Sequence, residues 1–339
     1  MDPGYVADVV RGLEGLAREE LVELGARLAG TADGEVRFSH PQPERVVARS
    51  RLVSAVYRAL EFEVPRPKAL LGDAAFRRLS GACREVAERG GMTTFRLAAA
   101  GSQTPVFRRL ADELARATGL AEDREDGELL LRVRRSRSGG WEALLRLSAR
   151  PLSARAWRVC NLPGGANATV AAGLARLVGG GSFLNLMCGS GTLVIERALA
   201  GPGGPYVGVD VSAEAVECAG RNAEEAGVAV HLLVDDVVRP EFRVTVPGGA
   251  VGSTFDVVAA DAPWGDAVGS HAANEGLYRS LLSAADRHVG PGGRLALLTH
   301  EVKLTERLVA QAKGWRRRES LRVEHGGHNP LLLVLQKVG

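Results

Sequence analysis

The residues best suited to chemistry form the stretch DAPWG at positions 261–265, which follows an apolar run without alternation. Such a run is typical of a strand buried on both faces of a sheet, and the proline and glycine that follow would end it. Asp261 and the backbone carbonyls of Ala262 and Pro263 would accept hydrogen bonds from an exocyclic amine. The ring of Trp264 would stack on a flat heterocycle. These four residues are the candidate catalytic residues; the alternative is an ordinary turn with a half-buried tryptophan.

A glycine-rich loop, NLMCGSGT at residues 185–192, is the second group of candidates. It has the pattern of a strand, a loop and a helix start, in which Thr192 would cap the helix. Gly189 and Gly191 would let the backbone approach a ligand closely, although this loop lacks the third glycine of a dinucleotide-binding motif. We predict cofactor contacts from the loop residues Asn185, Met187, Cys188, Gly189, Ser190 and Gly191.

Acidic residues follow the next two expected strands. Asp210, with Val211 beside it, comes 19 residues after Gly191, where an acid can bind both ribose hydroxyls of an adenosine. Asp235 and Asp236 follow the third strand and would accept a hydrogen bond from the adenine amine. Each acid alone could be a helix cap or a surface charge. Because these acids follow successive strands at matching positions, together they predict a cofactor site at the carboxyl ends of the strands.

The elements that must position these residues alternate between strand and helix over residues 180–339, which predicts a doubly wound parallel sheet. The final segments, 321–324 and 331–336, flank the turn GGHNP and are expected to close the sheet as antiparallel strands. His300 and His328 are interpreted as ordinary polar residues of a strand end and a loop. We expect strands at 183–187, 206–210, 230–234, 254–260 and 294–299, and helices at 192–199, 213–226 and 277–288.

The first half of the chain predicts two smaller α/β units. Residues 1–65 read as a ferredoxin-like unit with a strand near 34–38 and a helix near 43–60. Residues 66–152 repeat the mixture of helices and strands, and residues 153–179 form a linker that turns into a helix.

A basic stretch at 129–158 carries eight arginines against a single acid, Glu142, and also contains Trp141 and Trp157. Such a stretch could bind a phosphate backbone, as could the arginine run at 316–318. The alternative is a solvated strand face. The arginines of the stretch are 132, 134, 135, 137, 146, 150, 155 and 158.

The composition narrows the protein class. The net charge is only +3, and the four cysteines lie far apart without a CxxC pair. This spacing argues against a zinc site and against a disulfide framework, and it fits a reducing cytosol. Because no apolar run has the length of a membrane span or the form of a signal peptide, we expect a cytoplasmic protein with no membrane partner and no metal.

The four strand-end sites, in this order, resemble the Rossmann-like S-adenosylmethionine methyltransferases. CGSGT together with D-x-P-aromatic-G resembles the class that methylates exocyclic amines of nucleobases. Residues 66–152 and the following RPLSAR segment resemble a THUMP domain and linker of THUMP-containing RNA guanine-N2 methyltransferases. The resemblance implies S-adenosylmethionine as cofactor, and a monomer that methylates a guanine in or near the acceptor stem of tRNA, with ribosomal RNA as the alternative.

Two residues depart from that family's pattern: Asn185 stands where aspartate is usual, and Ala262 where proline is frequent. The amide at 185 motivates a second hypothesis, an RNA-binding protein with a weakened methyltransferase site. A third is the same domain acting on an adenine in DNA or on a protein glutamine, which the first 150 residues disfavour. A dehydrogenase is least favoured, because the third glycine is missing and no acid or base for hydride transfer stands out.

Overall fold

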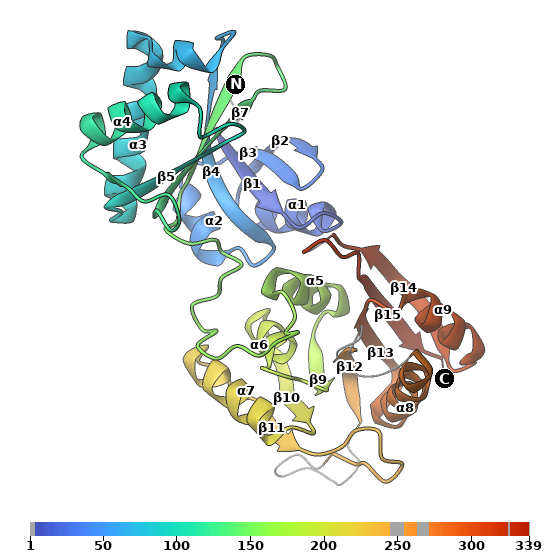
Figure 1. The fold of residues 1–339 in the computed structure, drawn as a ribbon. Helices are drawn as coiled ribbons and strands as arrows, with labels where there is room; N and C mark the ends of the chain where they lie inside the picture. The colour runs from blue at the N-terminus through green and yellow to red at the C-terminus, as the bar shows by residue number, and fades with distance from the viewer. Residues whose placement is uncertain (1–3, 245–253, 263–270, 325, 339) are drawn as a thin grey trace. The chain divides into compact units, whose positions relative to one another are not determined.

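The computed structural model describes residues 4–244, 254–262, 271–324 and 326–338. The chain forms two compact units, each built on its own β-sheet (Figure 1). The amino-terminal unit comprises Met1–Val9 and Ala17–Ser153, and the carboxy-terminal unit comprises Val10–Leu16 and Ala154–Gly339.

The amino-terminal unit contains an eight-stranded sheet in the order β2-β3-β1-β4-β8-β7-β5-β6. Helices α3 and α4 cover one face of this sheet, where their apolar side chains pack on β7 and β8 (Figure 1). The strands are β1 (Tyr5–Val9), β2 (Arg27–Ala32), β3 (Glu35–Ser39), β4 (Val53–Phe62), β5 (Thr94–Ala99), β6 (Ala121–Glu122), β7 (Leu129–Arg135) and β8 (Trp141–Arg146). The helices are α1 (Glu14–Glu23), α2 (Pro43–Arg49), η1 (Pro67–Leu71), α3 (Asp73–Gly90) and α4 (Pro105–Thr118).

Strand β4 corrects the helix expected at 43–60. The helix ends at Arg49, and the chain then forms β4, which lies between β1 and β8. Pairing on both sides outweighs the local preference of a segment rich in alanine and leucine. Because β4 and β8 pair, the units expected at 1–65 and 66–152 share one sheet; their division into two domains stays a prediction.

The carboxy-terminal unit contains a seven-stranded sheet in the order β11-β10-β9-β12-β13-β15-β14. β11, β10, β9, β12 and β13 are parallel, which confirms the expected doubly wound sheet. β15 and β14 close it as antiparallel strands, as expected, although β14 begins at Trp315 and ends at Arg322, earlier than the expected 321–324. The strands are β9 (Gly181–Leu186), β10 (Gly203–Asp210), β11 (His231–Val234), β12 (Phe255–Asp261), β13 (Val289–Thr299), β14 (Trp315–Arg322) and β15 (Leu331–Lys337). The helices are α5 (Ala168–Val178), α6 (Thr192–Leu199), α7 (Ala213–Glu225), α8 (His271–His288) and α9 (Val302–Gln311).

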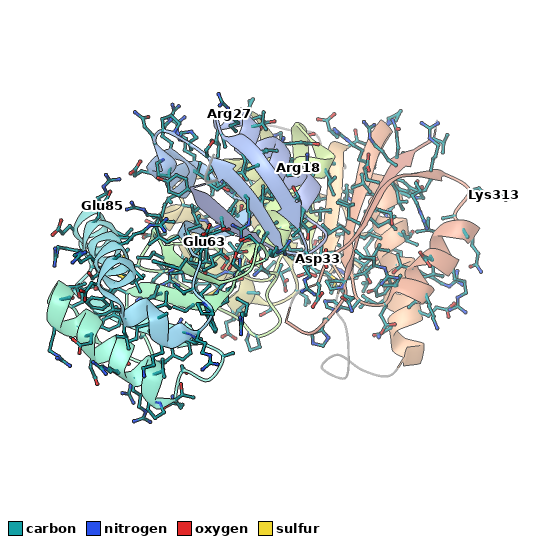
Figure 2. All side chains as sticks on the ribbon, turned by 90° about the horizontal axis from the view of Figure 1, so that it is seen from above. Arg18, Arg27, Asp33, Glu63, Glu85 and Lys313 are labelled. Carbon is teal, nitrogen blue, oxygen red and sulfur yellow. A yellow bond between two sulfur atoms is a disulfide. The ribbon has the colours of Figure 1, made fainter. Side chains whose placement is uncertain are left out.

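Alternate residues of the central strands face opposite sides of this sheet. Leu184 of β9 and Val258 of β12 belong to the core that α8 and α9 cover. The intervening residues, among them Asn185 and Asp261, therefore face the opposite side, which α5 covers. Charged side chains such as Arg27 and Lys313 project outward from the ribbon (Figure 2). None of the described helices is long and apolar enough to cross a membrane.

The linker before α5 is fixed to α6 by buried polar contacts. Arg155 Nε lies 2.9 Å from Glu196 Oε1, and the Glu196 side chain is fully buried. Arg158 donates to the Ala166 carbonyl at 2.7 Å and to the Thr192 hydroxyl. A charge this deeply buried requires a partner, so these arginines serve the fold of the carboxy-terminal unit.

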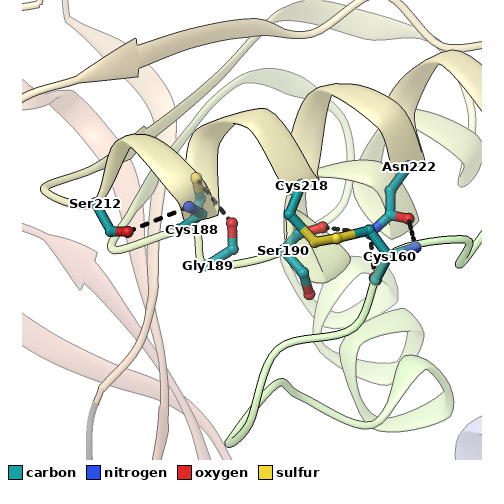
Figure 3. The surroundings of a disulfide bond; sticks show 8 residues. Cys160, Cys188, Gly189, Ser190, Ser212, Cys218 and Asn222 are labelled. Atoms are coloured by element: carbon teal, nitrogen blue, oxygen red, sulfur yellow. Dashed lines mark hydrogen bonds between the residues drawn. A yellow bond between two sulfur atoms is a disulfide. The ribbon is translucent and has the colours of Figure 1, made fainter.

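A disulfide joins Cys160 of the linker to Cys218 of α7, with a Cα–Cα distance of 5.4 Å (Figure 3). This corrects the expectation that the cysteines form no disulfide. Asn222, one turn further along α7, holds the two segments together: its amide accepts from the Cys160 N–H at 2.9 Å and donates to the Cys160 and Ser190 carbonyls, each at 2.9 Å. Tertiary contact thus brings together cysteines that are 58 residues apart in sequence.

Reducing this disulfide is expected to lower the free energy of unfolding by about 2–4 kcal/mol, because the bond restricts the unfolded chain. We expect a lower Tm for the wild-type protein in reducing than in oxidising buffer. The double variant Cys160→Ser/Cys218→Ser should melt at the same temperature in both. Alkylation of the unreduced, denatured protein should label only Cys83 and Cys188, and labelling of all four cysteines would contradict the bond.

Candidate active site

The candidate residues lie along one edge of the carboxy-terminal sheet. β10 ends at Asp210 and β12 ends at Asp261, while Asp235 and Asp236 directly follow β11. Because these strands are parallel, their carboxyl ends meet at the same edge. The chain order reverses at β9, which has β10 on one side and β12 on the other, so the glycine-rich loop lies at the switch point of the sheet.

The glycine-rich loop joins β9 to α6 through left-handed backbone conformations. Gly189 has φ 53° and Gly191 has φ 81°, and Met187 is the one non-glycine residue with positive φ in the described part of the chain. A Cβ at Gly191 would lie 3.0 Å from the Cβ of Ala219. Positive φ values of this kind are frequent at ligand sites, and the missing side chain at Gly191 lets the loop lie close to α7.

Asp210 is held between the glycine-rich loop and the start of α7. Its Oδ2 accepts the Gly189 N–H at 2.8 Å, and its Oδ1 accepts the Ser212 N–H at 3.0 Å. An ionised carboxylate has lone pairs left for two hydroxyls. Val211 is 68% exposed and Val234, which pairs with Asp210 across the sheet, is 56% exposed. A fixed acid beside two exposed apolar side chains suits a ribose that carries a flat base.

Asp235 and Asp236 are both engaged in local contacts. Asp235 Oδ1 pairs with Arg239 and accepts the Asp236 N–H at 2.7 Å. Asp236 Oδ1 accepts the Val238 N–H at 3.0 Å. The ion pair with Arg239 accounts for Asp235 as a surface charge, so Asp236 is the better candidate of the two for a contact with adenine.

Asn185 is buried in β9, with 1% of its surface exposed. Its Nδ2 donates to the Leu186 carbonyl at 3.1 Å and to the Ala259 carbonyl of β12 at 3.3 Å. Its Oδ1 is buried and has no hydrogen-bond partner among the described residues. A buried acceptor left in this state costs free energy unless a ligand satisfies it, and a cationic amine is a suitable donor.

Asp261 ends β12 level with Leu298 of β13, and the neighbouring Ala262 is buried and donates its N–H to the Leu298 carbonyl at 3.0 Å. Burial raises the pKa of the Asp261 carboxyl to about 7. Near neutral pH this group therefore exchanges a proton readily. The other two candidate catalytic residues, Pro263 and Trp264, lie outside the described residues.

A cavity of about 140 Å³ opens beside Asp261. Its lining comes from the turn before α5, the ends of β12 and β13, and the connection between β14 and β15. The lining residues are Gly164, Gly165, Ala166, Asn167, Val170, Asp261, Leu298, His300, Gly326, His328 and Pro330.

His300 and His328 both line this cavity, His300 from the end of β13 and His328 from the connection between β14 and β15, so their interpretation as ordinary polar residues of a strand end and a loop stays a prediction. Their rings meet edge to face, with centroids 5.5 Å apart. Burial, and to a lesser degree His328, lowers the pKa of His300 to about 4, so its imidazole is neutral at physiological pH. Asp261 was a candidate because it lies at the carboxyl end of a parallel strand, and His300 could have been found in the same way. No local signal in the sequence indicates that His328 lies at the site.

Comparison with known proteins decides the family. Residues 155–330 match the family described as "UPF0020: RMKL-like, methyltransferase domain". The chain belongs to this methyltransferase family. The match confirms the methyltransferase expected from the strand-end residues, and with it S-adenosylmethionine as cofactor. The buried Oδ1 of Asn185, the fixed carboxylate of Asp210 and the narrow glycine-rich loop fit that cofactor.

Individual relatives agree with the family match. The methyltransferase is 31% identical over 267 residues to the tRNA (guanine(6)-N2)-methyltransferase of Thermus thermophilus, covering 76% of this chain and 73% of the relative. The crystal structure of TrmN from Thermus thermophilus is 27% identical, with a TM-score of 0.76 over 98% of this chain and 99% of that one. A methyltransferase structure complexed with SAH, 15% identical, shares the fold with a TM-score of 0.68 over 99% and 97% of the two chains.

Most arginines of the basic stretch have partners inside the methyltransferase. In the amino-terminal unit, Arg132 contacts Asp8, Arg134 contacts Glu35 and Glu142, and Arg146 donates to backbone carbonyls. The linker arginines contact α6, and Trp157 is buried. The arginines of the stretch with exposed side chains are 135, 137 and 150, and the run at 316–318 on β14 is exposed as well.

The pKa of Asp261 predicts a pH-dependent stability. The folded-state pKa of about 7 lies above the ordinary aspartate pKa of 3.8, so the folded protein binds this proton more tightly than the unfolded chain does. The free energy of unfolding contributed by this group therefore falls as pH rises from about 4 to 7. Asp261→Asn keeps the group neutral, and we expect it to raise the free energy of unfolding at pH 8 by at least about 1 kcal/mol.

Urea denaturation at pH 5 and pH 8 measures this effect. The gain from Asp261→Asn should be clearly larger at pH 8 than at pH 5, where the folded carboxyl is still protonated and only the unfolded one is ionised. Asp286→Asn, on the exposed part of α8, serves as a matched control. An equal effect of Asp261→Asn at both pH values would contradict a raised pKa.

Asn185→Asp tests how the buried amide is used. An aspartate at this position has no N–H to offer the carbonyls of Leu186 and Ala259, so we expect the free protein to lose about 1–3 kcal/mol of stability. S-adenosylmethionine should raise the Tm of the variant by more than that of the wild type, because a carboxylate binds an ammonium more strongly. Thermal melting with and without cofactor measures both effects. Asn161→Asp in the exposed linker is the control, and an Asn185→Asp variant as stable as wild type without cofactor would refute the proposed bonding.

Proposed function

We propose that this methyltransferase transfers a methyl group from S-adenosylmethionine to the exocyclic N2 amine of a guanine in tRNA, at position 6 in the acceptor stem. The observation that carries the proposal is the likeness to the Thermus thermophilus tRNA (guanine(6)-N2)-methyltransferase, which spans most of both chains. The Asp261 cavity supports it, because a buried acceptor at the switch point of the sheet suits an exocyclic amine.

The bound cofactor supplies a methyl group made electrophilic by its sulfonium. The chain's own residues position the reactants and manage a proton. Asp261 accepts a hydrogen bond from the N2 amine, which directs the nitrogen lone pair toward the methyl carbon. Transfer would form a nitrogen–carbon bond as the carbon–sulfur bond broke, and the departing sulfur would keep the electron pair. With a pKa of about 7, Asp261 can take the proton that the nitrogen then loses.

The cofactor residues divide the work by position. Asn185 Oδ1 accepts from the cofactor ammonium, and Asp210 holds the ribose hydroxyls. Asp236 accepts from the adenine amine, and Val211 lies against the adenine ring. The cofactor site is bounded by the backbone of the glycine-rich loop residues Met187, Cys188, Gly189, Ser190 and Gly191. On the acceptor side, the carbonyls of Ala262 and Pro263 and the ring of Trp264 complete the clamp on the base.

The amino-terminal unit serves RNA binding in this proposal, with a ferredoxin-like part at 1–65 and a THUMP-like part at 66–152. Its phosphate contacts are the exposed arginines 135, 137 and 150, and the exposed run at 316–318 on β14 adds phosphate contacts from the carboxy-terminal unit. We propose that the protein acts as a monomer in the cytoplasm. A disulfide such as Cys160–Cys218 is rare in the cytoplasm, where thiols are kept reduced.

We do not favour the hypothesis of an RNA-binding protein with a weakened methyltransferase site. Asn185 was its basis, yet the Asn185 amide donates to two backbone carbonyls, and its buried oxygen has no hydrogen-bond partner among the described residues. An amide held in this way can bind an ammonium without a carboxylate.

Methyl transfer to tRNA transcripts tests the proposal. Tritium from labelled S-adenosylmethionine should appear in a transcript with guanosine at position 6, and not in a transcript with adenosine there. Asp261→Ala should lower the rate at least about 100-fold, because amine positioning and proton removal are both lost. Asp286→Ala should retain activity. Transfer to ribosomal RNA but not to tRNA would contradict the proposed substrate.

A further inference from the structure

Two histidines share the Asp261 cavity, and the proposed chemistry assigns them no role. His300 follows β13 two residues after Leu298, which pairs with Asp261. His328 comes from the connection between β14 and β15, far from β12 in sequence. Strand order and hairpin closure thus bring both imidazoles to the cavity in which we place the acceptor base.

A neutral imidazole is well suited to read a guanine. It offers one N–H donor and one lone pair, and His300 stays neutral at physiological pH because burial lowers its pKa to about 4. Guanine presents O6, an acceptor, on the same edge as its N1–H and N2 amine, whereas adenine presents an amine donor at position 6. With Asp261 binding the N2 amine, O6 requires a donor elsewhere in the cavity.

We propose that His300 donates a hydrogen bond to O6 of the target guanine and so selects guanine over adenine, and that His328 holds the His300 ring in place. This inference rests on the proposed methylation of guanine N2. It adds a specificity-determining residue, His300, and a positioning residue, His328.

The contact between the two rings supports the division of roles. The interplanar angle is 80° and the centroids are 5.5 Å apart, an edge-to-face geometry that aromatic rings favour. His300 is half-buried, whereas His328 is exposed. The half-buried ring of His300 therefore has the environment of a recognition group, and the exposed ring of His328 packs against it.

A thermodynamic cycle that combines a change in the target base with a change at His300 tests the proposal. Synthetic tRNA with 6-thioguanosine at position 6 keeps the N2 amine and N1–H but replaces O6 with sulfur, a poorer acceptor. We expect wild-type kcat/KM to fall about 10-fold with this substrate. His300→Ala should lose about 10-fold or more on guanosine and show no further loss on 6-thioguanosine, because the two changes remove the same bond.

Further substitutions distinguish the hydrogen-bond donor of each histidine from the packing of its ring. His300→Gln retains an N–H donor and should recover part of the preference for guanosine over 6-thioguanosine, whereas His300→Phe should not. His328→Phe should keep the wild-type preference, and His328→Ala should reduce it. Cofactor affinity measured by calorimetry should be unchanged in all four variants. His231→Ala, on exposed β11, should behave as wild type.

Failure of the roles proposed for His300 and His328 can be told apart from failure of the proposed guanine methylation. If the wild-type protein labels no guanosine at position 6, the methylation proposal falls, and this inference falls with it. If the wild type labels guanosine but His300→Ala retains the full preference over 6-thioguanosine, methylation stands and His300 does not read O6. If His328→Phe loses the preference as completely as His328→Ala, packing is not the role of His328.

Discussion

The site depends on the parallel pairing of β9 with β12. Asn185 pairs in register with Ala259, and the Asn185 amide donates to the Ala259 carbonyl, so a side-chain hydrogen bond reinforces the backbone pairing. Asp261 lies two residues further along β12 and therefore faces the same side of the sheet as Asn185. A shift of one residue in this pairing would turn Asp261 toward α8 and separate the cofactor side from the acceptor side.

The surrounding elements protect that arrangement. The disulfide and Asn222 hold the linker to α7 and to the Ser190 carbonyl, and the Arg155–Glu196 pair holds it to α6. As a result, the turn before α5, which follows the linker, lies at the Asp261 cavity and forms part of its lining. Buried polar contacts of this kind contribute specificity of position as well as stability, since leaving either partner alone would be costly.

The carboxy-terminal fold could be predicted because its signals are local. The helix expected at 192–199 is found there, and Asp210 and Asp261 end their strands because apolar runs stop at those points. Contacts between distant residues gave no such signal. β4 is a strand because of β1 and β8, and Cys160 meets Cys218 through the packing of the linker. Asn222, a polar residue on the buried face of α7, joins the same contact.

A crystal structure of the protein with S-adenosylhomocysteine tests the central claim most directly, because that claim concerns where the cofactor lies relative to Asp261. The account predicts the ligand ammonium within about 3 Å of Asn185 Oδ1. It also predicts the ribose hydroxyls on Asp210 and the sulfur facing the Asp261 cavity. A ligand bound away from the carboxyl ends of β9 and β10, or with its sulfur turned from that cavity, would contradict it.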